Sequence, residues 1–186
     1  MPHSIDLAAH EMVALTRASL AALRSALFRD AGPAAAAYLQ EAGYAGGEAL
    51  FASFGSWLRA QALDAPEDLD VKEFERHASA YFRDAGWGTL QIGALADAVA
   101  ILDSVDWGEA DPESGLDIPG CHLTTGMFAD FFGRIAETPL AVLEVECRST
   151  GAPRCRFLLG NTEVMVHIYD QLGRGASYEQ AVTEVE

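Results

Sequence analysis

The sequence predicts an α+β domain in which an antiparallel sheet of about four strands packs against a layer of helices. Residues 7–83 carry apolar residues at helical spacing, whereas residues 88–159 alternate between strand-like segments and one helical segment. Helices that precede two strand pairs favour an antiparallel sheet with helices to one side. The length of 186 residues suits one domain, and 50% hydrophobic with 22% charged residues is typical of a globular protein.

The helical half is expected to contain four helices, each bounded by a glycine, a proline or an acidic loop. Their expected ranges are 7–28, 33–41, 46–63 and 71–83. The stretch GYAGG (residues 43–47) lies between the second and third of these helices. It has no preceding strand, so it predicts a helix–helix turn or a close packing contact rather than a phosphate-binding loop.

The second half is expected to hold two strand pairs separated by a helix. The segments GTLQIGA and AVAILDSVDW predict strands, LTTGMFADFFGRI predicts a helix, and two further strands are expected; the ranges are 88–94, 98–107, 123–135, 140–148 and 154–159. A last helix is expected over residues 162–172. We therefore expect one ligand-binding domain over residues 1–160, with residues 161–186 as a C-terminal helix and tail.

The charge balance excludes several partners. Only 12 Lys and Arg residues stand against 28 Asp and Glu residues, a net charge of −16. Binding of nucleic acid needs a basic face, and the same negative field repels anionic membranes. The first residues show no secretory signal and no apolar run approaches a membrane span, so a cytoplasmic location is expected.

The stretch LEVECRSTGAPRCRF (residues 143–157) holds two of the three cysteines around a predicted turn. Together with the third cysteine it gives the pattern C-x22-E-x2-C-x7-C, with Cys121, Glu144, Cys147 and Cys155 as candidate zinc ligands. Glu144 and Cys147 point to opposite faces of a flat strand, so a shared site requires a bulge. Buried unreactive cysteines and a Cys147–Cys155 disulfide are the alternatives, and His122 is an alternative ligand.

Charge around these residues favours a cation. Three thiolates and a carboxylate carry −4, and zinc at +2 leaves −2. Arg148, Arg154 and Arg156 are a quarter of the basic residues and fall in this short stretch. We expect them to contact the ligands and offset the surplus.

The segments AGYAGGEALFASFG, DFFGRI and LEVECRSTGAPRCRF resemble the 4-vinyl reductase (4VR) domain family. The resemblance implies the fold of TRAPP vesicle-tethering subunits and a relation to heme-based nitric-oxide sensor domains. Members include sensor domains of aromatic-responsive bacterial activators, in which three cysteines and a glutamate hold a structural zinc. Carried over to this chain, the zinc ligands are Cys121, Glu144, Cys147 and Cys155, a closed set with no open position for catalysis.

The aromatic residues are candidates for a ligand pocket, although such residues also fill ordinary cores. The resemblance implies that Trp107 and Phe131 contact a ligand, and Trp87 and Phe128 are the further candidates. The sensors hold the phenol hydroxyl with a histidine, whereas Trp87 stands at the corresponding place here. A ligand larger or less polar than phenol is therefore expected.

No catalytic residue is predicted, because the sequence holds no nucleophile elbow, phosphate loop or H-E-x-x-H motif. The leading hypothesis is a zinc-stabilised, homodimeric sensor or carrier domain for a small hydrophobic or aromatic molecule, with output through a protein partner. The first predicted helix is the expected dimer contact. An enzyme or carrier of tetrapyrrole (bacteriochlorophyll) metabolism and a TRAPP-like scaffold are the alternatives, and a reductase would need a hydride source for which no cofactor motif is present.

Overall fold

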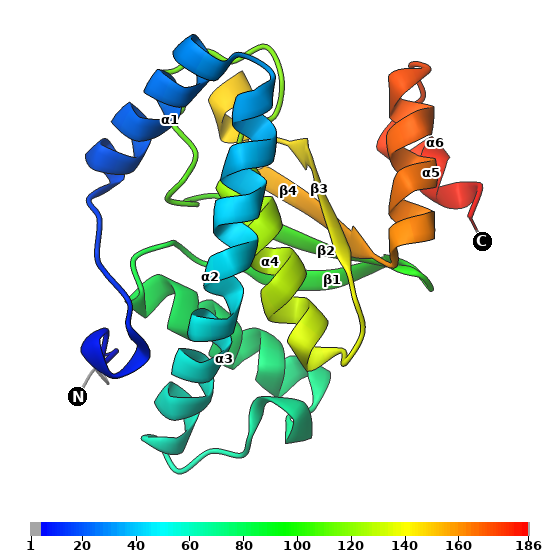
Figure 1. Cartoon of the computed structure of the whole chain (residues 1–186). Coiled ribbons are helices and arrows are strands. Elements are labelled where there is room, and N and C mark those ends of the chain that lie inside the picture. Colours follow the sequence, from blue (N-terminus) through cyan, green and yellow to red (C-terminus); the bar gives the residue numbers. More distant parts are fainter. Residues whose placement is uncertain (1–4, 186) are drawn as a thin grey trace.

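Four antiparallel strands form the centre of the computed structural model, which describes residues 5–185 (Figure 1). The strands are β1 (Gln91–Ala96), β2 (Val99–Ser104), β3 (Ala141–Glu146) and β4 (Cys155–Gly160). Their order across the sheet is β1-β2-β4-β3, so β4 lies between the two strands that flank the helical insertion. The four-stranded antiparallel sheet and the α+β class predicted from the sequence are confirmed.

Helices cover both faces of this sheet. The α-helices are α1 (Arg17–Ala31), α2 (Ala34–Arg59), α3 (Val71–Asp84), α4 (His122–Ile135), α5 (Thr162–Gly173) and α6 (Tyr178–Thr183), and the short 3-10 turns are η1 (Ala8–His10), η2 (Pro66–Asp68) and η3 (Arg148–Thr150). Helices α2 and α4 lie on one side of the sheet, and α5 and α6 lie on the other (Figure 1). Alternation along the strands explains this arrangement: Phe157 faces the larger core, whereas its neighbour Leu158 faces α5 and α6.

The expected second and third helices are one continuous helix, α2, so the prediction of a break near Gly43 was wrong. The glycines here are packing contacts. A Cβ on Gly43 would overlap the carbonyl oxygen of Leu123, and one on Gly126 would overlap that of Gln40. Glycine lets the backbones of α2 and α4 touch, and their close crossing outweighs the weak helix propensity of glycine.

This crossing predicts opposite effects for two glycines of the same helix. Gly43→Ala should lower the free energy of unfolding by about 2 kcal/mol or more, because the new methyl group overlaps backbone atoms of α4. Gly46→Ala is the matched control, since a Cβ there meets nothing within 4 Å and alanine favours the helix by roughly 0.5–1 kcal/mol. Urea unfolding of both variants tests this, and equal midpoints would contradict the assigned contact.

The first helix begins at Arg17 and not near residue 7, a second correction. Thr16 caps it, because its side chain accepts a hydrogen bond from the Ser19 N–H at 3.1 Å. The apolar residues before the cap, Val13 and Leu15 among them, are exposed and belong to an irregular segment. Helical spacing alone therefore mistook this segment for the start of the helix.

Within residues 5–185, the helices are too short or too polar for any of them to cross a lipid bilayer.

Candidate metal site and apolar cavity

Cys121, Glu144, Cys147 and Cys155 converge from three parts of the fold and form what we call the cysteine–glutamate cluster. Cys121 is the N-cap residue of α4, Glu144 lies on β3, and the other two cysteines flank the β3–β4 connection. One potential ligand atom from each residue lies within 4.8 Å of the others, and all four residues are buried. The three cysteines are free thiols.

A β-bulge brings Glu144 to the cluster, as the sequence required. Strand β3 pairs with β4 in register up to Glu144 opposite Phe157, and the register shifts before Glu146 opposite Arg156. The connection then turns through η3 and Gly151, whose φ of 86° favours glycine. The bulge and the turn together aim Glu144 and Cys147, three residues apart, at the same point.

The carboxylate of Glu144 is half satisfied by the protein. Its Oε2 accepts a hydrogen bond from the Cys121 N–H at 2.7 Å, whereas the buried Oε1 has no partner among residues 5–185. Burial and the neighbouring Cys147 raise the pKa of Glu144 to about 9. A buried oxygen without a donor is what a metal ligand looks like before the cation is counted.

The sulfur positions fit tetrahedral coordination. Cys121 Sγ lies 3.8 Å from Cys147 Sγ and 4.0 Å from Cys155 Sγ. Two thiolates at a Zn–S distance of about 2.3 Å in a tetrahedron are separated by roughly 3.8 Å. The residues present therefore fit a four-coordinate metal ion with three sulfur ligands and one oxygen ligand.

Two expectations about the surroundings of the cluster were wrong. Arg154 and Arg156 do not reach it: Arg154 donates to Glu146 at 3.0 Å, and Arg156 pairs with Asp103 at 2.6–2.7 Å. These side chains lie on the face of the sheet that carries α6, because neighbouring residues on a strand alternate in direction. His122 is also no ligand, since its ring packs against Phe28 with centroids 5.9 Å apart.

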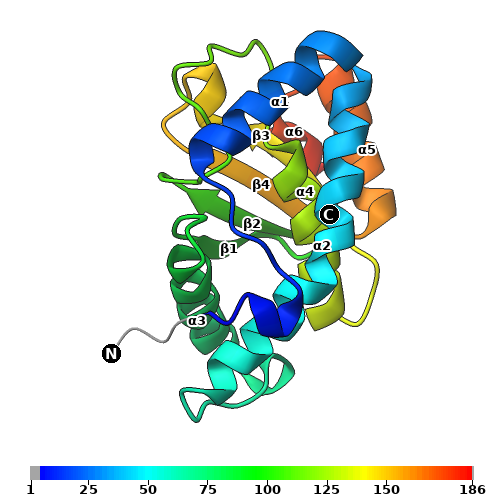
Figure 2. The same ribbon diagram turned by 60° about the vertical axis from the view of Figure 1, so that its left-hand side comes forward.

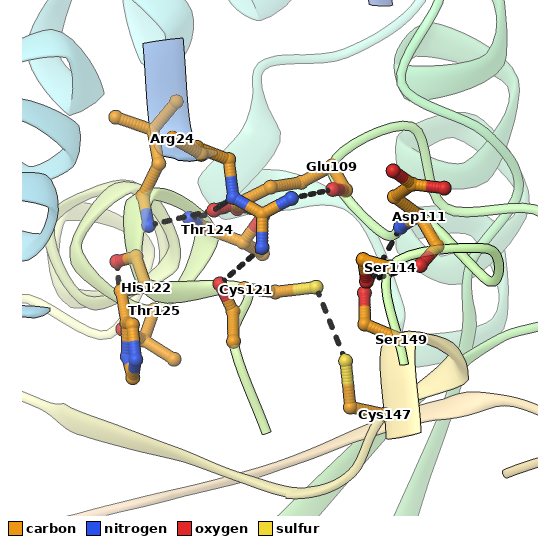
Figure 3. Close-up of polar contacts among 12 residues, drawn as sticks. Arg24, Glu109, Asp111, Ser114, Cys121, His122, Thr124, Thr125, Cys147 and Ser149 are labelled. Carbon is orange, nitrogen blue, oxygen red and sulfur yellow. Dashed lines mark hydrogen bonds and ion pairs between the residues drawn. The ribbon is translucent and has the colours of Figure 1, made fainter. Parts of the chain in front are cut away.

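A buried ion pair fixes the start of α4 beside Cys121 (Figure 3). Arg24 of α1 donates to the carbonyl oxygens of Glu109 and Gly120, and its Nε lies 3.3 Å from Glu109 Oε1. Glu109 in turn accepts from the backbone N–H groups of Leu123 at 3.1 Å and Thr124 at 2.7 Å. A carboxylate at these free N–H groups stabilises the helix N-terminus.

Sequence reasoning missed both partners of this pair. Arg24 lies among the apolar residues of a helix, and Glu109 lies in an acidic loop, so neither stands out in the sequence. Burial raises the pKa of Glu109, opposed by Arg24 and the donors at Thr124 and Leu123. The pair therefore belongs to the buried architecture of the site and not to its surface.

The predicted ligand-binding residues form one aromatic cluster. Trp107, Phe128 and Phe131 are fully buried, and the rings of Trp107 and Phe128 lie 5.1 Å apart. The indole N–H of Trp107 donates to Thr124 Oγ1 at 2.7 Å, and that hydroxyl donates to Glu109. Trp87 stacks on Trp107 with centroids 5.7 Å apart and planes inclined by 21°, and it is partly exposed.

An apolar cavity of about 500 Å³ opens next to Trp87. Its walls come from the N-terminal segment, the first turn of α1, the loop between α3 and β1, and the start of α4; Met12, Leu15, Leu20, Trp87 and Leu123 are among the lining residues. Figure 2 shows the N-terminal segment running from η1, beside α2 and α3, to α1. Of the four predicted ligand-binding residues, Trp87 lines this cavity, and the other three lie behind it in the core.

Residues 113–161 match the family model of the vinyl-4-reductase (4VR) domain, and this range contains all four residues of the cysteine–glutamate cluster. The match confirms the resemblance to the 4-vinyl reductase domain family. No curated protein matches the chain.

Similar solved structures agree on the fold. They include the phenol-responsive sensory domain of the transcription activator PoxR with phenol (19% identity, 82% of this chain and 77% of that chain, TM-score 0.62). A trafficking protein particle complex subunit 3 from Naegleria fowleri, covalently bound to palmitic acid, is also similar (11%, 77% and 91%, 0.59). A vinyl-4-reductase family protein from Methanocaldococcus jannaschii aligns less well (20%, 65% and 66%, 0.47). The first two establish the fold shared by aromatic sensors and TRAPP subunits.

Proposed function

We propose that this chain is a sensor or carrier domain that binds a small hydrophobic or aromatic molecule. The observation that carries the proposal is the apolar cavity beside Trp87, which stacks on the buried Trp107. A volume of about 500 Å³ lies within the range of small-molecule sites. The shared fold of the PoxR domain, whose structure holds phenol, supports the same conclusion.

The ligand is larger or less polar than phenol. Trp87 offers an indole surface at the place where the resemblance would put a hydrogen-bonding histidine, and the lining of the cavity is mostly apolar. The inner residues Trp107, Phe128 and Phe131 support Trp87 from behind and form the inner part of the site.

The cysteine–glutamate cluster holds a structural zinc ion in this proposal. Support comes from the sulfur spacing and from Glu144 Oε1, which no group of residues 5–185 contacts by a hydrogen bond. Three thiolates favour zinc over magnesium or calcium, which prefer oxygen ligands. A four-ligand site leaves no coordination position for a substrate, so zinc holds β3, β4 and α4 together and takes no part in chemistry.

The assembly and output follow from the same proposal. Residues 1–160 form the ligand-binding domain, and residues 161–186 are its C-terminal helix and tail. A homodimer through α1 is proposed because Leu23 on that helix is exposed. Output passes to a protein partner in the cytoplasm, since the negative charge of the chain disfavours nucleic acid.

A ligand panel tests the binding function. We expect the melting temperature to rise with the concentration of at least one aromatic compound from a set of alkylphenols, naphthols and porphyrins, because binding to the folded state stabilises it by about 2.7 kcal/mol at 100 times Kd. Native mass spectrometry should show the same compound retained at one per chain. If metal-loaded, folded protein shows neither a shift nor a retained compound, the sensor and carrier functions are wrong.

A further inference from the structure

The flat aromatic surface in the wall of the cavity belongs to Trp87, which is the one aromatic residue among the described residues that line it. One face of this indole stacks on Trp107, which is completely buried, so the exposed part of Trp87 faces the cavity. We infer, on the basis of the proposed function, that the ligand is a neutral planar aromatic molecule that stacks on Trp87 beneath the N-terminal strap, residues 5–16. Such a ligand extends the stack that Trp107 and Trp87 begin.

Trp87 is held in place before any ligand arrives. Its N–H donates to the Phe82 carbonyl at 2.9 Å, and its own carbonyl accepts from the Gly108 N–H at 2.5 Å. The next residues are fixed by Asp106, whose Oδ1 accepts from the Thr89 N–H at 2.8 Å and the Thr89 hydroxyl at 2.9 Å. A stacking surface with a fixed backbone loses little conformational freedom when a ring packs against it.

The charged groups at the cavity already have partners, which favours a neutral ligand. Arg17 donates to the carbonyl oxygen of Gly86 at 2.9 Å and lies 3.5 Å from that of Asp106. Asp84 pairs with Arg83 at 3.1 Å. Arg17 and Asp84 also balance each other in charge, and the net charge of −16 disfavours anions. The remaining lining residues supply mainly apolar surface.

The N-terminal strap supplies the outer wall. Val13 and Leu15 line the cavity while 83% and 66% of their surface is exposed. Large apolar side chains on an irregular segment gain stability when a ligand covers them. The alternative site, between Trp107, Phe128 and Phe131, is closed, because their rings pack on one another and on Phe82 at 5.1–5.7 Å.

The test compares two compounds with the same carbon skeleton, 2-naphthol and its saturated form decahydro-2-naphthol. Isothermal titration of the full, metal-loaded chain should show tighter binding of 2-naphthol. Trp87→Leu should weaken 2-naphthol binding roughly three- to tenfold, the contribution expected of one aromatic pair, and should abolish the preference over the saturated compound. Metal content and circular dichroism confirm that the variant is folded.

A second pair of variants tests the strap without touching the core. Val13→Ser should weaken 2-naphthol binding by about two- to fivefold, because part of its apolar surface packs on the ligand. Val71→Ser is the matched control: Val71 is 76% exposed, begins α3 and does not line the cavity, so its Kd should equal that of the wild type.

The outcomes separate this inference from the proposed function. If the wild-type chain binds 2-naphthol but both Trp87→Leu and Val13→Ser bind it unchanged, the ligand lies elsewhere and only the site assignment is wrong. Equal or tighter binding of decahydro-2-naphthol, or preferential binding of palmitate, overturns the planar class. Burial of the strap against a second copy, seen as a dimer that dissociates in Val13→Ser, also overturns the assignment. Failure of the whole aromatic panel overturns both proposals.

Discussion

Glu144→Gln and Cys147→Ser should each reduce the zinc content of the purified protein well below one ion per chain and lower its melting temperature by about 10 °C or more. The expected loss is about 4 kcal/mol or more, because a structural zinc contributes its binding energy to folding, and 1 kcal/mol corresponds to roughly 2–4 °C for a chain of this size. Without the ion, buried polar ligand groups remain with few partners.

The matched control for this prediction is Glu146→Gln. Glu146 lies two residues from Glu144 on the same strand, but its carboxylate pairs with Arg154 and Tyr178 on the opposite face. Its substitution should leave the metal content at one per chain. Elemental analysis and thermal unfolding measure both effects. Unchanged metal content in Cys147→Ser and Glu144→Gln, or equal losses in Glu146→Gln, would show that the cluster does not hold the ion.

The cysteine–glutamate cluster was predictable because its pattern is local where geometry is demanding. Cys147 and Cys155 flank a single turn, and the need for a bulge at Glu144 followed from the two-residue period of a strand. Only Cys121 is remote, and the family resemblance supplied it. The structure adds the reason for its position: the Cys121 N–H donates to Glu144, so the ligand set is joined by a hydrogen bond as well.

The errors share one physical cause, which is tertiary packing that local signals do not carry. Gly43 and Gly47 are typical of a helix end, yet the close approach of α4 requires small residues inside a continuous helix. The apolar spacing of Val13 and Leu15 is helical, yet both side chains are exposed instead of packed in the core. Arg156 carries a charge suited to the cluster but lies on the other face of the sheet.

Arg24→Met should be among the most destabilising single changes outside the cluster, with an expected loss of about 3–5 kcal/mol. The substitution keeps an apolar stem but leaves the buried Glu109 without its cation, and breaking one half of a buried pair costs about this much. Arg29→Met is the matched control on the same helix, because Arg29 pairs with Asp30 in solvent; its unfolding midpoint should match the wild type.

The double variant Arg24→Met/Glu109→Gln distinguishes an unpaired charge from lost packing. Removing both charges should recover much of the loss, since the uncompensated carboxylate is then gone. Arg24 also donates to the carbonyl of Gly120 at 2.6 Å, directly before Cys121, so Arg24→Met should release its metal to a chelator faster than Arg29→Met. The same pair meets Trp107 through Thr124. A change in stability without faster metal release would mean that Arg24 supports α1 alone; faster release places α1, the cysteine–glutamate cluster and the aromatic cluster in one coupled unit.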